Sequence, residues 1–270
     1  MWSADIGGKR FDWGSRTYVM GIVNVTPDSF SGDGLGTDVE AAVAQGLRMA
    51  GEGADMLDVG GESTRPGHVA VSAQEEIRRT DAVVRRLAAE SSVPVSIDTY
   101  KEEVATRAIE GGATILNDVW ALTRSPAIAD LAAHNDCALV LMHNQDGTDY
   151  AGDLMDEIKR FLSVATRRAV AAGVPREKVI VDPGIGFGKT ADQNWVVMQR
   201  FEELKELGHP ILIGTSRKSF IGKLLDLPVD QRLEGTEATV VAAVLRGADI
   251  VRVHDVLPMT RAVRVADRMK

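Results

Sequence analysis

Several features that mark particular protein classes are scarce in this sequence. Its 270 residues contain one cysteine, Cys137, so no disulfide can form within the chain and a reducing, cytoplasmic setting is expected. Apolar runs such as residues 240–245 are far shorter than the roughly 20 residues that cross a bilayer. The first residues have neither the basic start nor the apolar stretch of a secretory signal. We therefore expect no interaction with a membrane.

An excess of positive charge is also missing. Lys and Arg number 31 against 39 Asp and Glu, for a net charge of −8, whereas nucleic-acid binding needs a basic surface. The 44% of hydrophobic and 26% of charged residues are ordinary values for a globular protein. The composition thus predicts a globular enzyme or binding protein that does not bind nucleic acid. A local cationic pocket for a small anion remains compatible with it.

Eight short runs rich in Val, Ile and Leu alternate with longer amphipathic segments. Each run is too short for a helix and has the continuous apolar character of a strand buried on both faces, as parallel sheets require. Helix starts are indicated between them by Ser72 and Thr99, each followed three residues later by Glu. The predicted strands are residues 18–25, 55–59, 93–98, 113–117, 137–143, 178–182, 209–214 and 249–254.

Strands that alternate with helices pair in parallel through right-handed crossovers. Eight such units favour a closed (β/α)₈ TIM barrel over an open sheet. No linker-like change of composition divides the chain, so residues 1–270 are predicted to form a single α/β domain. The segment before Tyr18 is predicted to be a short N-terminal β-hairpin that could plug the barrel floor.

Polar side chains stand at the end of nearly every predicted strand. In a TIM barrel these ends meet at one mouth, where the active sites of this fold lie. Carboxylates and amides would face the cations Arg217, Lys218, Arg252 and His254, an arrangement that suits a polar heterocycle beside an anion. The strand-end residues are Asn24, Asp58, Asp98, Asn117, His143, Asp182, Ser216, Arg217, Lys218, Arg252 and His254.

Three loops add candidates at the mouth. The loop after the first strand carries Asp33 and is long enough for a lid. The loop after the second strand carries Arg65, whose guanidinium suits phosphate recognition. Residues 182–190 resemble a phosphate loop, but Pro183 stands where a Walker A motif has its first glycine. Its glycines instead predict a close approach of backbone to a flat ligand, with Phe187 as an aromatic wall.

Taken in order, these motifs make the chain similar to the dihydropteroate synthase family over essentially its whole length. No single motif carries the resemblance; their succession does. The matching segments are residues 20–31, 58–67, 95–99, 117–118, 141–143, 182–189, 216–219 and 252–254.

The resemblance implies a folate-biosynthetic transferase. Such an enzyme joins 4-aminobenzoate to 6-hydroxymethyl-7,8-dihydropterin diphosphate, releasing 7,8-dihydropteroate and pyrophosphate. It also implies Mg²⁺ as a cofactor, a homodimer and a target for sulfonamides, which mimic aminobenzoate.

The resemblance further implies roles for individual residues. Asn24 would contribute to the Mg²⁺ site. The pterin would be bound by Asp98, Asn117, Asp182 and Lys218. The anion side would be lined by Thr64, Arg65, Arg252 and His254, and the aminobenzoate side by Pro66, Phe187, Lys218 and Ser219. Further substrate-binding positions would be Met142, Gly186, Gly214 and Ser216. Catalytic roles would fall to Asp33, Arg65, Lys218, Arg252 and His254.

One loop departs from the family pattern. The family commonly reads Ser-Asp-Gly-Gly where this chain has Ser31-Gly32-Asp33-Gly34, so the lid carboxylate is displaced by one position. That displacement leaves open a non-catalytic paralogue that binds pterin. The sequence is also compatible with a pterin-dependent methyltransferase of the same barrel type, and with a family enzyme that discriminates against sulfonamides.

Overall fold

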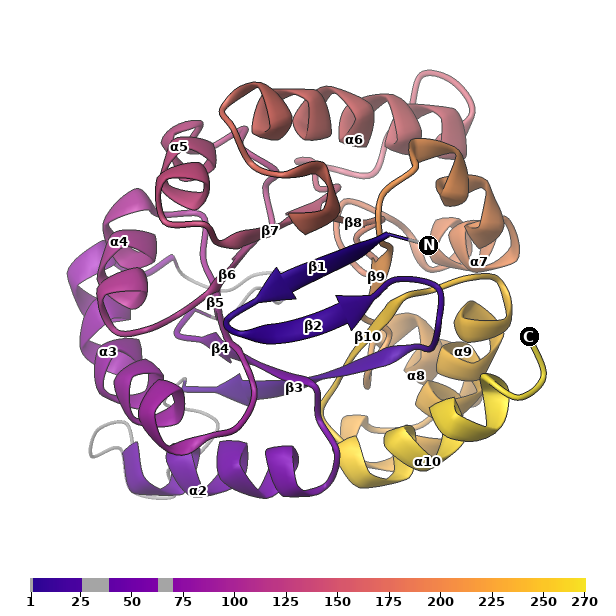
Figure 1. The fold of residues 1–270 in the computed structure, drawn as a ribbon. Coiled ribbons are helices and arrows are strands. Elements are labelled where there is room, and N and C mark those ends of the chain that lie inside the picture. Colours follow the sequence, from indigo (N-terminus) through magenta and orange to yellow (C-terminus); the bar gives the residue numbers. More distant parts are fainter. Residues whose placement is uncertain (1, 26–38, 63–69) are drawn as a thin grey trace.

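A closed barrel of parallel strands forms the centre of the molecule, and helices surround it (Figure 1). The structure is a computed structural model and describes residues 2–25, 39–62 and 70–270. Neighbouring strands pair in the order β8-β7-β6-β5-β4-β3-β10-β9, and a parallel bridge between Val181 and Ile211 joins the two ends of this row. The predicted (β/α)₈ barrel is therefore confirmed. The barrel strands are β3 (Tyr18–Asn24), β4 (Met56–Gly60), β5 (Val95–Asp98), β6 (Ile115–Asp118), β7 (Ala138–Met142), β8 (Val179–Asp182), β9 (Leu212–Ile213) and β10 (Ile250–Val253).

The connections between strands are helical. Besides the α-helices, the described part of the chain contains three short 3₁₀ helices, at Arg176–Lys178, Phe201–Leu207 and Val229–Gln231. None of the described helices combines the length and the apolar composition that crossing a membrane requires. The α-helices are α2 (Val39–Gly51), α3 (Ala73–Glu90), α4 (Glu102–Glu110), α5 (Ala127–His134), α6 (Leu154–Ala171), α7 (Ala191–Gln199), α8 (Ser219–Leu225), α9 (Leu233–Leu245) and α10 (Val256–Ala266).

The seventh barrel strand, β9, is much shorter than the predicted residues 209–214. Pro210 has no N–H to donate to a ladder, although its carbonyl accepts from the N–H of Val181 at 2.9 Å. The N–H of Ile211 donates to the Asp249 carboxylate at 2.9 Å instead of to a strand. Only two residues are left for regular pairing.

One of the two predicted helix starts is confirmed. The Ser72 hydroxyl caps α3 by accepting from the N–H of Glu75 at 3.2 Å. The prediction for Thr99 is wrong, because α4 begins at Glu102 with Lys101 in the capping position. The Thr99 hydroxyl accepts from the N–H of Lys101 at 3.2 Å and so stabilises the turn before the helix.

Successive residues of the barrel strands point in turn into the barrel and out toward the helices, and seven of the eight strands contribute apolar residues to both sides. On β3, Tyr18 and Met20 belong to the interior cluster, whereas Val19 and Val23 pack outward in the core under the helices. This period of two follows from strand geometry. Consequently, the residue two positions beyond the last interior apolar residue of a strand also faces the barrel axis.

The predicted N-terminal hairpin is confirmed as an antiparallel pair of β1 (Ser3–Ile6) and β2 (Lys9–Asp12). It lies across one end of the barrel (Figure 1), and Phe11 and Trp13 join the interior apolar cluster there. The Trp13 indole N–H donates to the carbonyl of Glu177 at 2.9 Å. This end of the barrel is thus closed by apolar packing, and the opposite end carries the polar strand ends.

Candidate active site

The interior positions change from apolar to polar toward the open end of the barrel. Two residues beyond the interior apolar residues Met56, Ile115, Ile180 and Ile250, each strand presents a hydrogen-bonding side chain. The sequence-predicted strand-end residues are therefore brought together inside one mouth. The interior positions reached in this way are Asp58, Asn117, Asp182 and Arg252, with Met142 and Gly214 on β7 and after β9.

Arg252 lies between two carboxylates at the centre of this group. Its Nε donates to Oδ2 of Asp58 at 2.6 Å, and its Nη2 donates to Oδ2 of Asp98 at 2.8 Å. The Asp58 side chain is fully buried, whereas 19% of the Arg252 side chain is exposed. Charge-assisted contacts on two nitrogens fix the plane of the guanidinium and leave Nη1 for other partners.

Asn117 shares the same carboxylate. Its Nδ2 donates to Oδ2 of Asp58 at 2.9 Å, so the amide oxygen is the atom that remains for a ligand. Asp58 was expected among the strand-end residues of the mouth, but the sequence assigned it no individual binding or catalytic role. Its position in the apolar-to-polar series of β4 is the signal that could have identified it.

Asp182 has one oxygen committed to the backbone. Its Oδ1 accepts from the N–H of Gly184 at 2.7 Å. Burial raises the pKa of Asp182 to about 6, against this hydrogen bond and the nearby charge of Lys218, which lower it. Burial also raises the pKa of Asp98, and it outweighs the attraction of Arg252.

The raised pKa values predict that binding of the pterin implied by the sequence resemblance weakens in acid. An ionised carboxylate accepts on both oxygens and more strongly than a protonated carboxyl group, so protonation of Asp182 or Asp98 weakens it as an acceptor from a pterin donor and places an O–H donor in the pocket. Below the raised pKa of Asp182, we expect the dissociation constant to rise by up to about tenfold per pH unit and per group that must ionise. Calorimetry between pH 5 and 8, in buffers of different ionisation enthalpy, measures both the affinity and the protons released on binding. An affinity that is constant over this range would contradict the assignment of these carboxylates as acceptors.

Lys218 and Phe187 form the opposite wall of the mouth. The Lys218 ammonium lies 4.1 Å from the centroid of the Phe187 ring, a cation–π contact. Gly186 has φ +81°, and a Cβ there would come within 3.0 Å of the Lys218 side chain. The glycine thus leaves the space that this lysine occupies.

Lys189, which the sequence analysis had not singled out, supports the loop that carries Phe187. Its buried ammonium donates to the carbonyls of Gly184 and Phe187 at 3.0 Å each and to Nδ1 of His143 at 2.9 Å. Burial lowers the pKa of His143 to about 3, so its ring is neutral and can accept. A lysine that closes a glycine-rich loop onto its own carbonyls holds Gly186 and Phe187 in place.

Gly184 is the tightest point of this loop. It has φ +70°, and a Cβ there would lie 2.0 Å from the His143 carbonyl oxygen. Gly184→Ala should therefore lower the free energy of unfolding by about 3 kcal/mol, since both strain and a backbone clash oppose it. Gly147→Ala is the matched control, because Gly147 also has positive φ (+82°) but nothing within 4 Å of its Cβ position. Thermal unfolding of both variants checks this, and equal melting temperatures would contradict the packing described.

Burial disfavours the charged form of His254, against the prediction that it is one of the cations of the mouth. Its Nδ1 lies 2.9 Å from the Ser216 hydroxyl and its Nε2 lies 3.4 Å from Nδ2 of Asn24. Burial, reinforced by the positive charge of Arg252, lowers the pKa of His254 to about 3. The ring therefore acts at the mouth as a neutral hydrogen-bonding group.

Arg217 was also predicted to be a cation of the mouth, and its charge is paired with Asp255. Its guanidinium makes two hydrogen bonds to the Asp255 carboxylate, at 2.6 and 3.0 Å. Its backbone is in the left-handed region, with φ +55°. Ser216 and Lys218, on either side, take the positions described above.

The remaining predicted residues lie at the rim or outside the described part of the chain. Ser219 is exposed at the start of α8. Asp33, Thr64, Arg65 and Pro66 lie outside the described residues. The predicted roles of all these residues stay predictions.

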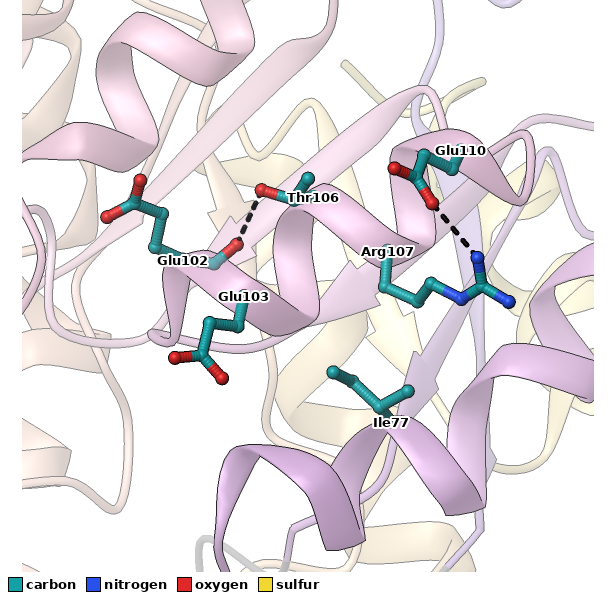
Figure 2. A pocket seen from close by; sticks show the side chains of 6 residues that line it. All are labelled: Ile77, Glu102, Glu103, Thr106, Arg107 and Glu110. Carbon is teal, nitrogen blue, oxygen red and sulfur yellow. Dashed lines mark hydrogen bonds and ion pairs between the residues drawn. The ribbon is translucent and has the colours of Figure 1, made fainter.

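An open groove of about 350 Å³ lies elsewhere, on the outer helical layer between α3 and α4 (Figure 2). Ile77 reaches it from α3, and Arg107 on α4 is paired there with Glu110 at 3.0 Å. No strand end contributes to its lining, so it is separate from the mouth.

Comparisons with known proteins identify the family of this chain. A family model described as "Pterin binding enzyme" matches residues 20–254. A dihydropteroate synthase from Clostridium beijerinckii is 50% identical over 263 residues, 97% of each chain. The chain belongs to the dihydropteroate synthase family.

Solved structures of the family superpose closely on this fold. Dihydropteroate synthase from Clostridium difficile, solved in the presence of pteroic acid, has a TM-score of 0.93 at 50% identity and covers 96% of this chain and 98% of that one. The enzyme from Xanthomonas albilineans in complex with 7,8-dihydropteroate has a TM-score of 0.91 at 42% identity, covering 99% and 98%. Family membership confirms the resemblance read from the motifs. It favours a synthase over a methyltransferase.

Proposed function

We propose that this chain is a dihydropteroate synthase. It joins 6-hydroxymethyl-7,8-dihydropterin diphosphate to 4-aminobenzoate and releases 7,8-dihydropteroate and pyrophosphate. The observation that carries this proposal is the division of the mouth into acceptors and donors. Asp98, Asn117 and Asp182 supply oxygens, while Lys218 and Arg252 supply N–H groups.

This division matches the edge of a pterin. The amino group and ring N–H of a pterin are donors that suit the carboxylates and the Asn117 oxygen, and its carbonyl and ring nitrogens are acceptors that suit Lys218. A ring bound in this way would have its hydroxymethyl diphosphate directed toward the rim, where Arg65 is proposed to contact the phosphates.

The chemistry requires charge stabilisation rather than an activated protein nucleophile. The amine nitrogen of aminobenzoate forms a bond to the methylene carbon of the pterin, the carbon–oxygen bond to diphosphate breaks, and the amine loses a proton. Negative charge develops on the departing pyrophosphate, so cations are needed beside it. Cys137 begins the apolar strand segment at the closed end, and burial raises the pKa of its thiol to about 11, which makes it unsuitable as a nucleophile.

The residues present fit a Mg²⁺ that arrives with the diphosphate. Nδ2 of Asn24 faces His254, so its Oδ1 is available, and a Cβ on Gly60 would lie 3.8 Å from both this oxygen and Oδ2 of Asp98. Glycine thus keeps any side chain away from the Asn24 oxygen, while Oδ2 of Asp98 is already bonded to Arg252. Mg²⁺ characteristically takes one or two protein oxygens plus phosphate oxygens and water. When bound, it would neutralise charge on the leaving group. In the described ranges, no set of three or more His, Cys, Asp or Glu could hold a metal unaided.

Aminobenzoate is proposed to lie against Phe187, with Lys218, Ser219 and Pro66 around it. Sulfonamides share its shape and would compete for that position. The displaced Asp33 is proposed to act in the lid despite its shift, since Gly32 and Gly34 beside it permit backbone conformations closed to other residues.

We further propose a cytoplasmic homodimer. Exposed apolar side chains lie on the neighbouring helices α8 and α9 and between them: Leu224, Leu225, Val229 and Leu245 are 44–66% exposed. Such a group of side chains supports burial against a second copy of the chain. Sedimentation velocity would distinguish a dimer from a monomer.

Turnover tests the proposed activity directly. With both substrates and Mg²⁺, dihydropteroate and pyrophosphate should appear in equal amounts, and omission of either substrate should abolish both. Binding of pterin without product would identify the non-catalytic paralogue and would overturn the proposal.

A further inference from the structure

We propose that Asp58 is a positioning residue that sets the hydrogen-bonding polarity of the pterin pocket without contacting the pterin. It acts through Asn117 and Arg252, both of which donate to its Oδ2. The inference rests on the proposed function, because the pocket is taken to bind a pterin.

Asp58 lies too deep to be a ligand residue itself. It is on β4, two residues before Gly60, and Gly60 is the register partner of Asp98 at the mouth. Asp58 is paired one level lower, with Ser96, and its side chain is fully buried. Asp98 lies one step nearer the mouth on the neighbouring strand, and the Arg252 side chain, which is partly exposed, contacts both carboxylates.

The carboxylate decides which end of the Asn117 amide faces the ligand. An amide has a donating and an accepting end of nearly equal size, and either could point into the pocket. A carboxylate only accepts, so it selects the orientation in which Nδ2 points down at 2.9 Å and Oδ1 points to the ligand. The pocket then presents three acceptors to the pterin donors.

The same oxygen also orients the guanidinium. Arg252 is held at Nε by Asp58 and at Nη2 by Asp98, on separate strands. With Asp98 alone the guanidinium could rotate about that single contact. Two contacts fix its plane and direct Nη1.

A contribution to the stability of the fold does not explain why a carboxylate occupies position 58. Its Oδ1 is buried without a hydrogen-bond partner among the described residues, as is Oγ of Ser96, its register partner. A buried carboxylate with an unsatisfied oxygen loses stability relative to an apolar side chain of similar volume. Its contribution is therefore expected in binding, where the orientation of its two donors is used.

Calorimetry with 6-hydroxymethylpterin tests this. Asp58→Asn keeps the shape, but an amide opposite an amide no longer selects one orientation of Asn117, and the charge beside Arg252 is lost. We expect the affinity of Asp58→Asn to fall at least tenfold. Ser96→Ala, at the same depth and with no hydrogen bond to its hydroxyl oxygen among the described residues, is the matched control and should stay within twofold of the wild type. An affinity of Asp58→Asn equal to that of the wild type would overturn the inference.

A double-mutant cycle separates positioning from a general structural effect. If Asp58 acts largely through Asn117, Asp58→Asn should weaken binding clearly less in an Asn117→Ala background than in the wild type. If Asp58→Asn weakens binding by the same factor in both backgrounds, Asp58 does not act through Asn117. If wild-type protein does not bind the pterin, the proposed function fails and this inference with it. If the wild type binds the pterin and Asp58→Asn binds it equally well, the proposed function stands and only the inference about Asp58 fails.

A second measurement covers the case in which Asp58→Asn does not fold. In wild-type protein without ligand, the side-chain NH₂ protons of Asn117 should be protected from hydrogen exchange by their bond to Asp58. Asn117→Ala identifies their NMR signal. Rapid exchange of these protons before ligand is added would overturn the proposed orientation of the amide.

Discussion

Asp182→Asn is expected to weaken pterin binding by at least about a hundredfold, equivalent to about 2.7 kcal/mol. The N–H of Gly184 donates to Oδ1 of Asp182 at 2.7 Å, so an amide at this position must keep its oxygen toward Gly184. Its NH₂ group would then point into the pocket and meet a pterin donor. Loss of the bond and burial of two opposed donors each contribute, and each unpaired buried polar group costs about 1–3 kcal/mol.

The matched control is Asp118→Asn. Asp118 is also buried, and burial raises its pKa to about 6, but its oxygens accept from the N–H groups of Trp120 and Leu122 at 2.9 and 2.6 Å. Asp118→Asn should therefore lower the melting temperature with little change in pterin affinity. Calorimetry with a pterin diphosphate analogue compares the two variants, and unchanged affinity in Asp182→Asn would remove Asp182 from the site.

Arg252→Met is expected to lower both stability and pterin affinity. It leaves the carboxylates of Asp58 and Asp98 close together without their counter-ion, and breaking a buried ion pair costs about 3–5 kcal/mol. The pKa of Asp98, already raised by burial, should rise further. Protonated Asp98 is a poorer acceptor, so bare hydroxymethylpterin as well as its diphosphate should bind at least about tenfold more weakly.

The stability loss should depend on pH. A carboxyl whose pKa in the folded state lies above its unfolded value stabilises the folded state at low pH, and this contribution is lost as pH rises through the folded pKa. Arg252→Met should therefore be destabilised more at pH 8 than at pH 5. Urea unfolding at both values measures this.

Arg217→Met is the matched control for this variant. The ion pair of Arg217 with Asp255 is more exposed than the pairs of Arg252, since 37% of the Arg217 side chain and 24% of the Asp255 side chain are exposed. Its loss should therefore cost no more than about 1 kcal/mol. Equal stability losses in the two variants would show that the Arg252 network is not buried as described.

The periodicity of the sequence predicted the barrel, because buried parallel strands and amphipathic helices leave distinct patterns. Local exceptions were harder to predict. β9 is short since Pro210 cannot donate and the N–H of Ile211 is used by Asp249, a residue distant in sequence. α4 begins beyond the expected cap because Thr99 binds the turn.

The position of the site could be predicted more fully than its charges. Strand-end residues converge in any such barrel, so Asp98, Asn117 and Asp182 could be identified from their places in the chain. The neutral state of His254 depends on burial and on Arg252, and Arg217 turns to Asp255 through a left-handed backbone. The role of Asp58 depends on a tertiary contact with residues on two other strands.

Dihydropteroate formation by wild-type protein and by Asp182→Asn, measured side by side at limiting pterin diphosphate with aminobenzoate and Mg²⁺ in excess, tests the central claim most directly. The wild type should produce dihydropteroate and pyrophosphate in equal amounts, and the variant should be at least about a hundredfold slower at that pterin concentration. Equal rates for the two proteins, or no product from the wild type, would contradict the claim that the strand-end residues form a pterin-binding catalytic site.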